Sequence, residues 1–463
     1  MKYDVIVAGS GPGGYVAAIR AAQLGFKTAV IEKEAVGGIC LNWGCIPTKA
    51  LLKSAQVYNY ISHSADYGIT IKGDIKPDFK SMIDRSRGVA GEMSKGVQFL
   101  LKKNKVEQIM GYARVKPGKK VEVTDKEGEK KDYEAEHIII ATGARSKELP
   151  GLKQDGKKII GYREAMSLKK QPESMVVVGS GAIGAEFAHF YHSIGTKVTL
   201  VEYLPNILPL EDEDSSKQLA RSFKKRKMKV MTSAEVTGVD TAGKKCKVQI
   251  KTKKKEEEVQ ADIVLSAVGV SSNIEDIGLE DVGIKVENDK ITVDEFYRTN
   301  VEGYYAIGDV IPGPALAHVA SHEGIICVEK IAGQAPEPMD YNNIPGCTYT
   351  VPEVASVGYT EKQAKEAGYN IKVGKFPFTA SGKAKAAGNA EGSVKVIFDA
   401  KYGEWLGAHM VGENVTEMIA EAVVARKLET TMHEIIKAVH PHPTLSEAIM
   451  EAAAAANDEV IHL

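Results

Sequence analysis

Two cysteines with four residues between them are the side chains best suited to redox or metal chemistry. Cys40 and Cys45 lie in the segment Gly37-Gly-Ile-Cys-Leu-Asn-Trp-Gly-Cys-Ile-Pro-Thr-Lys49. Such a pair could bind zinc, with His440 and His442 completing a set of four ligands. Alternatively, it is a redox dithiol that opens and closes, with one sulfur facing a flavin and the other a substrate disulfide. A nearby helix start would lower the pKa of a thiol there. We favour the dithiol and keep zinc as the alternative.

Two glycine-rich loops in separate parts of the chain share one pattern. They are Gly9-Ser-Gly11-Pro-Gly-Gly14 and Gly179-Ser-Gly181-Ala-Ile-Gly184, and a glutamate follows each at the same offset, at Glu32 and Glu202. In such loops the first glycine makes the turn, the second lets a pyrophosphate approach, and the third lets helix and strand pack closely. The carboxylate accepts hydrogen bonds from a ribose. A turn without a ligand would gain nothing from so many glycines, so the sequence predicts two bound dinucleotides.

The residues after the second glutamate bear on the choice of nucleotide. Residues 203–208 read Tyr-Leu-Pro-Asn-Ile-Leu and contain no arginine that could receive a 2′-phosphate. We therefore expect the second site to prefer NAD to NADP.

Apolar runs on either side of each loop predict the strands and helices that position it. Each loop should lie between a strand and an alanine-rich helix, with a second strand delivering the glutamate. The expected elements are strands at 3–8 and 28–31 around a helix at 15–24, and strands at 175–178 and 197–201 around a helix at 185–194. Two further strands with a glycine exit are expected at 137–143 and 262–269.

Length, charge and cysteine content limit the class of protein. The 463 residues suggest two to four domains, and 60 Lys and Arg against 61 Asp and Glu give a net charge of −1. We expect neither nucleic acid nor a membrane as partner. The residues after Met1 predict a strand rather than a signal peptide, and no apolar run is long enough to span a bilayer. Five scattered cysteines do not suit a secreted disulfide scaffold. We expect a cytoplasmic protein.

The cysteine segment and the C-terminal His440-Pro-His-Pro-Thr-Leu-Ser-Glu447 resemble the active-site sequences of the flavin-dependent pyridine nucleotide-disulfide oxidoreductases. The resemblance covers nearly the whole chain and is greatest to the members that oxidise protein-bound dihydrolipoyl groups with NAD. It implies an α/β fold with two Rossmann-like dinucleotide-binding domains and a C-terminal α+β dimerisation domain. The implied boundaries are an FAD-binding domain at 1–148, an NAD-binding domain at 149–271, a central segment returning to the FAD domain at 272–342, and an interface domain of a homodimer at 343–463.

The resemblance also implies roles for the residues around the cysteines. Cys40 matches the interchange thiol that attacks the substrate, and Cys45 matches the thiol in charge-transfer contact with the flavin. Lys49 and Glu186 match an ion pair beside the flavin and nicotinamide rings. These four residues are expected to be catalytic, and Lys49 and Glu186 are also expected to contact the cofactors.

By the same resemblance, His442 is the catalytic base and Glu447 the carboxylate that orients it, and the pair serves the active site of the other subunit. The chemistry calls for these types, because a dithiol needs a base whose pKa is near neutral and a carboxylate fixes the tautomer of such a base. A histidine that only packs beside Pro443 is the alternative. Pro443 could follow a cis peptide bond that aims His442.

The cofactor contacts implied by the resemblance fall into two sets. The residues expected to contact FAD are Gly9, Gly11, Gly14, Glu32, Lys49, Ala113, Thr142, Gly143, Gly308, Asp309 and Ala317. The residues expected to contact NAD are Gly179, Gly181, Gly184, Glu186, Glu202, Val236 and Gly269. The chain departs from many relatives at residues 270–273, where it has Val-Ser-Ser-Asn in place of an Arg and a Pro. No metal site is expected.

Two other functions remain as alternatives, a reductase of another small disulfide and a non-catalytic nucleotide-binding scaffold. Glutathione-type reductases carry arginines on the second nucleotide unit, and mercuric-type reductases carry a C-terminal cysteine pair, and this chain has neither. A reductase of another small disulfide keeps the same machinery, while a non-catalytic nucleotide-binding scaffold would need neither the dithiol nor His442.

No lipoyl-like domain precedes Met1, so we expect the lipoyl group on a carrier protein of a 2-oxo acid dehydrogenase or glycine cleavage complex. Packing or surface roles are expected for three cysteines, Cys246, Cys327 and Cys347.

Overall fold

A computed structural model describes residues 2–463, which form two compact units. The first unit contains the residues up to Ala50 together with Ser81–Lys147 and Gly269–Met339, and the second contains Leu51–Lys80, Glu148–Val268 and Asp340–Leu463. Helices α3 (Cys45–Ser62) and α4 (Phe79–Lys103) each have residues in both units. The expected division into four domains stays a prediction.

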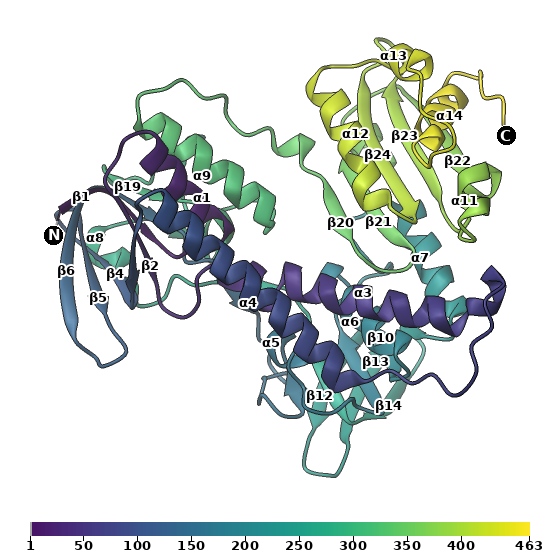
Figure 1. Cartoon of the computed structure of the whole chain (residues 1–463), viewed down its shortest axis with the longest axis horizontal. Coiled ribbons are helices and arrows are strands. Elements are labelled where there is room, and N and C mark those ends of the chain that lie inside the picture. Colours follow the sequence, from purple (N-terminus) through teal and green to yellow (C-terminus); the bar gives the residue numbers. More distant parts are fainter. Residues whose placement is uncertain (1) are drawn as a thin grey trace. The chain divides into compact units, whose positions relative to one another are not determined.

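The first unit is built on a mixed sheet with the strand order β3-β2-β1-β6-β5-β4, and β19 pairs with β6 (Figure 1). Its strands and helices are β1 (Lys2–Ala8), α1 (Pro12–Gln23), β2 (Thr28–Glu32), α2 (Gly38–Trp43), β3 (Glu107–Met110), β4 (Tyr112–Lys116), β5 (Lys120–Thr124), β6 (Lys130–Ile140), β7 (Ala144–Ser146), β16 (Val270–Ser272), α8 (Leu279–Val282), β17 (Val286–Glu287), β18 (Lys290–Ile291), β19 (Tyr304–Ala306) and α9 (Ala317–Ile331). Strands β2, β1, β6 and β19 run parallel. Their apolar residues are almost wholly buried, as the central strands of a covered parallel sheet require.

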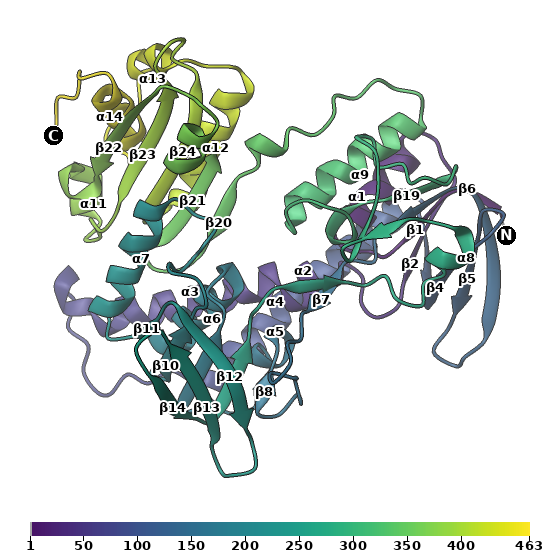
Figure 2. The same cartoon turned by 180° about the vertical axis from the view of Figure 1, so that it is seen from behind.

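Helices α1 and α9 pack closely in the first unit, side by side in both views (Figure 1, Figure 2). The close approach depends on glycine, because a Cβ on Gly324 would lie 2.8 Å from the carbonyl oxygen of Gly13. An ion pair of 2.6 Å between Arg20 and Glu329 joins the two helices near their C-terminal ends. These contacts fix the helix that follows the first glycine-rich loop.

The second unit contains a fully parallel sheet with the order β11-β10-β9-β15-β8 and an antiparallel sheet β12-β13-β14. Their elements, with the neighbouring helices, are β8 (Ile159–Ile160), α5 (Tyr162–Ala165), β9 (Ser174–Val178), α6 (Ala182–Ser193), β10 (Lys197–Val201), α7 (Glu213–Lys225), β11 (Lys229–Met231), β12 (Ala234–Asp240), β13 (Cys246–Thr252), β14 (Glu256–Ala261) and β15 (Ile263–Ser266). The two predicted strand–loop–helix–strand units are confirmed as β1-α1-β2 and β9-α6-β10. Both helices begin inside their loops, earlier than predicted, and at Pro12 the fixed φ of proline favours the first turn.

The C-terminal part of the second unit is an antiparallel sheet with the order β20-β21-β24-β23-β22 (Figure 2). Its elements are β20 (Gly346–Thr348), β21 (Glu353–Gly358), α10 (Glu361–Glu366), β22 (Ile371–Pro377), α11 (Gly382–Ala386), β23 (Ser393–Asp399), β24 (Trp405–Gly412), α12 (Val415–Lys427), α13 (Met432–Lys437) and α14 (Glu447–Ala456). Helix α12 packs on β21 and β24, and α14 packs on β22 and β23. A Cβ on Gly374 of β22 would overlap the carbonyl oxygen of Ala452, so glycine lets α14 lie directly on the sheet.

A buried ion cluster joins α7 to the C-terminal sheet within the second unit. The Lys395 ammonium, 6% exposed, lies 2.8 Å from Asp212, 3.0 Å from Asp214 and 2.8 Å from Glu361. Hydrogen bonds from Lys365 and Lys395 lower the pKa of Glu361 to about 2. Removing one partner of such a buried cluster would leave an uncompensated charge, which is strongly destabilising. The cluster therefore holds the start of α7 against β23 and α10.

Short 3-10 turns connect several elements, among them η1 (Ser64–Tyr67), η2 (Gly308–Val310), η3 (Tyr341–Asn343) and η4 (Phe378–Ala380). The peptide bonds before Pro352 and Pro443 are cis.

Within residues 2–463, no helix combines the length and the apolar character that crossing a bilayer requires.

Candidate functional site: a disulfide beside a glycine-rich loop

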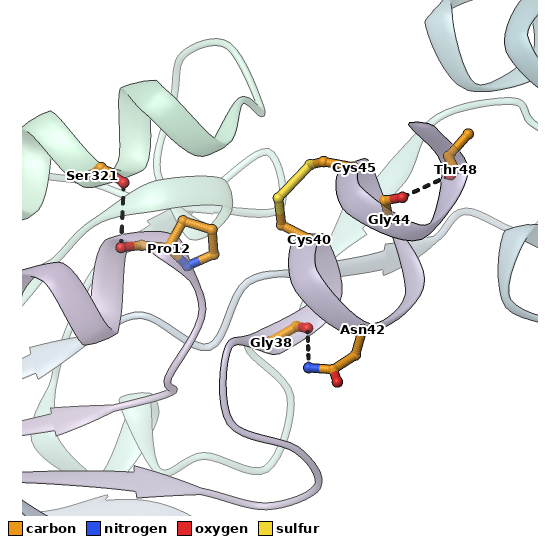
Figure 3. Close-up of a disulfide and its surroundings, with 8 residues drawn as sticks. All are labelled: Pro12, Gly38, Cys40, Asn42, Gly44, Cys45, Thr48 and Ser321. Atoms are coloured by element: carbon orange, nitrogen blue, oxygen red, sulfur yellow. Dashed lines mark hydrogen bonds between the residues drawn. A yellow bond between two sulfur atoms is a disulfide. The ribbon is translucent and has the colours of Figure 1, made fainter. Parts of the chain in front are cut away.

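Cys40 and Cys45 are joined to each other as a disulfide, with their Cα atoms 4.8 Å apart (Figure 3). Cys40 lies in α2 and is half-buried, and Cys45 is exposed as the first residue of α3. The structure therefore has the closed form of the predicted dithiol. Among residues 2–463, no three His, Cys, Asp or Glu side chains gather as a metal site would require, so the zinc alternative finds no support there.

The segment before Cys40 lies directly against the first glycine-rich loop. Gly37 donates its N–H to the Ser10 carbonyl at 3.1 Å and to the Ser10 hydroxyl at 3.2 Å. A Cβ on Gly38 would lie 2.6 Å from the Cα of Gly11. Both Gly37 and Gly38 have positive φ angles, 96° and 61°, which favour glycine. The disulfide is thus placed by the same loop that should bind a dinucleotide.

Side-chain hydrogen bonds hold the two helices that carry the sulfurs. The Asn42 amide, which is buried, donates to the Gly38 carbonyl at 3.0 Å (Figure 3). It also donates to the Val36 carbonyl at 3.0 Å. Thr48 donates to the Gly44 carbonyl at 2.7 Å. Helix α4 adds a contact at 2.9 Å from the Ser86 hydroxyl to the Pro47 carbonyl. The start of α3 is therefore rigidly supported, and its positive dipole end favours a thiolate at Cys45 when the disulfide opens.

The two glycine-rich loops have the same geometry. Gly9 and Gly179 have φ angles of 107° and 94°. A Cβ on Gly14 would overlap the Gly9 carbonyl oxygen, and one on Gly184 would overlap the Gly179 carbonyl oxygen. The middle glycines, Gly11 and Gly181, meet nothing within 4 Å and so leave the loop open at that point, as the approach of a pyrophosphate would require.

The two glutamates after the loops are also held alike. One oxygen of Glu32 accepts from the Ser10 N–H at 3.1 Å and from its hydroxyl at 2.6 Å. The corresponding oxygen of Glu202 accepts from the Ser180 N–H at 2.8 Å and from its hydroxyl at 2.7 Å. Ser10 and Ser180 were missed from the sequence, although the shared Gly-Ser-Gly triplets were the signal. They fix the carboxylates that should bind the two riboses.

The other residues predicted to contact FAD lie in the first unit. Ala113 is on β4, Thr142 and Gly143 follow β6, Gly308 and Asp309 form η2, and Ala317 begins α9. The Thr142 hydroxyl donates to the Asn273 carbonyl at 2.7 Å, which ties the end of β6 to the segment after β16. Burial raises the pKa of Asp309, with Lys290 opposing the rise. The roles of these residues stay predictions.

The remaining residues predicted to contact NAD divide between the units. Glu186 is buried on α6 and accepts from the Tyr349 N–H at 3.0 Å, and Val236 lies on β12 beside an irregular register. Gly269 belongs to the first unit and has a φ of 110°. Lys49 lies in the first unit and Glu186 in the second, so their ion pair stays a prediction.

His442 and Glu447 form a hydrogen-bonded pair at the start of α14. His442 Nδ1 lies 2.8 Å from Glu447 Oε1, and the other carboxylate oxygen accepts from the Thr444 N–H at 2.8 Å. Burial opposes ionisation of Glu447, but the Thr444 N–H and the His442 ring lower its pKa overall. The His442 side chain is 79% exposed, so its free Nε2 faces outward. The arrangement is that of an imidazole whose tautomer is fixed by a carboxylate.

The remaining cysteines have structural environments. Cys246 on β13 and Cys327 on α9 are buried, and Cys347 on β20 is partly buried. Burial raises the pKa of the Cys246 thiol. Burial also raises the pKa of Cys327, so the two buried thiols are poorly suited to form thiolates, in agreement with the packing roles expected for them.

Replacing Gly184 by alanine should disable the second loop without disturbing the first. The added Cβ would overlap the Gly179 carbonyl oxygen and push α6 from the loop. We expect the KM for NAD to rise at least about tenfold, while the first loop keeps its dinucleotide. Gly91→Ala on α4, where a Cβ meets nothing within 4 Å, is the matched control. An unchanged KM for NAD in Gly184→Ala would contradict the assignment of this loop.

Comparisons with known proteins agree with this geometry. The chain matches the family model described as pyridine nucleotide-disulphide oxidoreductase over residues 3–324 and the model of its dimerisation domain over residues 344–453. A dihydrolipoyl dehydrogenase of Rhizobium etli is 50% identical over 100% of this chain and 99% of its own. That of Bacillus subtilis is 45% identical, again over 100% and 99%.

Similarity extends to a mitochondrial relative and to a solved structure. The mitochondrial dihydrolipoyl dehydrogenase of Pisum sativum is 43% identical over 99% of this chain and 92% of its own. A crystal structure of LpdA from Mycobacterium tuberculosis superposes with a TM-score of 0.91 at 28% identity, covering 97% of this chain and 99% of that one. The expected α/β fold with a C-terminal dimerisation domain is confirmed. The chain belongs to the pyridine nucleotide-disulphide oxidoreductase family.

Proposed function

We propose that the protein oxidises protein-bound dihydrolipoyl groups to lipoyl groups with NAD, using FAD and the Cys40–Cys45 disulfide. The observation that carries this proposal is the closed disulfide packed against the first glycine-rich loop. Relatives that share up to half of the sequence over its full length are dihydrolipoyl dehydrogenases. The open middle glycines and the fixed carboxylates of both loops fit two bound dinucleotides, which are FAD and NAD in this family.

The chain's own residues perform the thiol chemistry. A substrate thiolate attacks the Cys40 sulfur, so a mixed disulfide forms and the Cys40–Cys45 bond breaks, leaving Cys45 as a thiolate. The second substrate sulfur then displaces Cys40, which closes the lipoyl disulfide and leaves the protein pair reduced by two electrons. His442 accepts a proton from the substrate dithiol, and Glu447 holds its ring in the required tautomer. A flavin held at the first glycine-rich loop would supply the chemistry that links the reduced thiol pair to hydride transfer to NAD.

The His442–Glu447 pair serves, in this proposal, the disulfide of the other subunit of a homodimer. Residues 344–453 match a dimerisation domain, and both residues lie within that range. The 79% exposure of the His442 side chain in a single chain supports this arrangement, since a base must be covered by the site in which it acts.

The lipoyl group arrives, we infer, on a carrier protein of a 2-oxo acid dehydrogenase complex or of a glycine cleavage complex, in the cytoplasm. The relatives named dihydrolipoyl dehydrogenases support a partner that carries a lipoyl group.

A substrate comparison tests the proposed function. The purified holoenzyme is given NAD and either dihydrolipoamide or reduced glutathione, and formation of NADH is followed. We expect dihydrolipoamide to be preferred by at least about a hundredfold in kcat/KM, because its two thiols on one molecule make the second displacement intramolecular. Equal or faster reaction with glutathione would favour a reductase of another small disulfide. Bound nucleotides without reaction of either thiol would favour a scaffold.

A further inference from the structure

His440 has a hydrogen-bond acceptor at each of its two ring nitrogens. Nδ1 lies 3.0 Å from the Ala438 carbonyl oxygen, and Nε2 lies 2.7 Å from Glu421 Oε1. Carbonyl and carboxylate oxygens only accept, so both ring nitrogens must donate, and a histidine that donates from both is an imidazolium. The hydrogen bond to Glu421 raises the pKa of His440, and the Ala438 carbonyl adds to the rise while burial opposes it.

His440 and His442 are two residues apart but have opposite environments. The His440 side chain is 8% exposed and faces Glu421 on α12, whereas the His442 side chain is 79% exposed and pairs with Glu447 on α14. The carboxylates that act on His440 are therefore Glu421 from α12 and Glu447 from α14. The buried His440 is therefore placed to hold the segment to α12, and the exposed His442 is placed to react.

The segment between α13 and α14 depends on side chains for its conformation. Pro441 and Pro443 flank His442, and neither has an N–H to donate. The Thr444 hydroxyl donates to the Pro441 carbonyl at 2.8 Å, which closes the segment on the side of α14. On the side of α13, the contact of His440 with Glu421 ties the segment to the helix that packs on β21 and β24. His442 lies between these two attachments.

We propose that His440 is a positioning residue for His442: as a cation held between Ala438 and Glu421, it fixes the segment that presents the base. This inference rests on the role proposed above for His442. Loss of the contact would leave His442 paired with Glu447 but would free the backbone on one side of it, so the base would be displaced relative to the substrate thiol.

A pH dependence follows from the charge on His440. Because its pKa is raised in the folded protein, the imidazolium and its two hydrogen bonds are present at lower pH and are lost as the pH rises through the raised pKa. Above that pH a neutral ring can donate from only one nitrogen. The difference in the rate of disulfide reduction between the wild-type protein and a variant without His440 should therefore become smaller in alkaline solution.

Stopped-flow reduction of the holoenzyme by dihydrolipoamide, from mildly acidic to alkaline pH, tests the proposal with His440→Gln. At neutral pH we expect disulfide reduction to slow by about tenfold or more, as small displacements of a catalytic group do. The ratio of wild-type to variant rates should fall toward one as the pH rises. Reoxidation of the reduced enzyme by NAD should be unchanged, because it does not use His442.

Two further variants complete the test. Glu421→Gln keeps the His440 ring but removes the carboxylate that raises its pKa. His440 should then lose its proton at a lower pH than in the wild-type protein. The rate of disulfide reduction by Glu421→Gln should therefore drop below the wild-type rate at that lower pH. His462→Gln is the matched control, because His462 Nδ1 pairs with Glu451 at 2.6 Å outside the segment, and it should react like the wild type. FAD content and dimer mass are measured for each protein.

A rate ratio that stays constant across the pH range would overturn the proposal, since it would mean that the ring only fills space. Equal slowing of both half-reactions would also overturn it. If His440→Gln fails to fold, Glu421→Gln decides by the same criteria. If His442→Gln leaves the rate of disulfide reduction unchanged, the proposed function of His442 fails. If His442→Gln lowers this rate but His440→Gln and Glu421→Gln do not, only the positioning role of His440 is contradicted.

Discussion

Cys45→Ser will lower turnover of dihydrolipoyl substrates by at least about four orders of magnitude, the scale seen when an essential nucleophilic unit is broken. Cys45 closes the disulfide with Cys40 and begins α3, so serine leaves Cys40 without a partner sulfur. The family resemblance assigns Cys45 to the charge-transfer contact with the flavin. The long-wavelength absorption band of the two-electron-reduced protein should therefore also disappear, and a spectrum with a turnover assay checks both results.

Two cysteine variants serve as controls for this experiment. Cys40→Ser should lose turnover but keep the long-wavelength absorption, because the Cys45 thiolate is still present. Cys347→Ser, which changes a partly buried cysteine on β20 that is in no disulfide, should behave like the wild type. A band that persists in Cys45→Ser would mean that the two thiols have been assigned in the wrong order.

His442→Gln should lower turnover by about 10²-fold to 10⁴-fold, the usual contribution of a positioned general base, while FAD stays bound. Glutamine can still occupy the site beside Glu447, 2.8 Å from Nδ1 of the native ring, but it cannot accept the substrate proton at neutral pH. The measurement is steady-state NADH formation with dihydrolipoamide, normalised to the flavin absorbance of each preparation.

The control for the histidine experiment is His433→Gln, because His433 is exposed on α13 and lies outside the segment that carries the base. It should leave turnover unchanged. Mixed dimers of His442→Gln with Cys45→Ser would test the exchange between subunits. If each base serves the other subunit's disulfide, such dimers keep one intact site. Turnover no higher than that of the His442→Gln protein would argue that base and disulfide come from the same chain.

The local elements around the two loops were predictable because their signals are local. Strand, glycine turn and helix follow within about 25 residues, and each glycine of Gly9, Gly11 and Gly14 has the steric reason expected for it. The helix starts were placed too late, since Pro12 and Ala182 begin helices inside the loops. The choice between zinc and a disulfide could not be made from spacing alone, because four intervening residues suit both.

Contacts between distant segments were not predictable from the sequence. The approach of Gly38 to Gly11 depends on how the cysteine segment folds back over the first loop. The anchoring of His440 depends on α12 reaching the segment before α14, which brings Glu421 within 2.7 Å of the ring. Both are tertiary contacts that no periodicity reports. The loop serines were different, because Ser10 and Ser180 occupy equal positions in two matching loops and the repeat pointed to them.

Counting thiols through one catalytic cycle tests the central claim most directly. The chain has five cysteines, of which Cys246, Cys327 and Cys347 are not joined in a disulfide. Holoenzyme denatured before reaction should show three thiols, and holoenzyme denatured after anaerobic addition of excess dihydrolipoamide and removal of that reagent should show five. In a third sample, NAD is added to the reduced holoenzyme before denaturation. NADH should form, and the thiol count should return to three. A count that stays constant while NADH is formed would contradict the account, because electrons would then reach NAD without opening the Cys40–Cys45 disulfide.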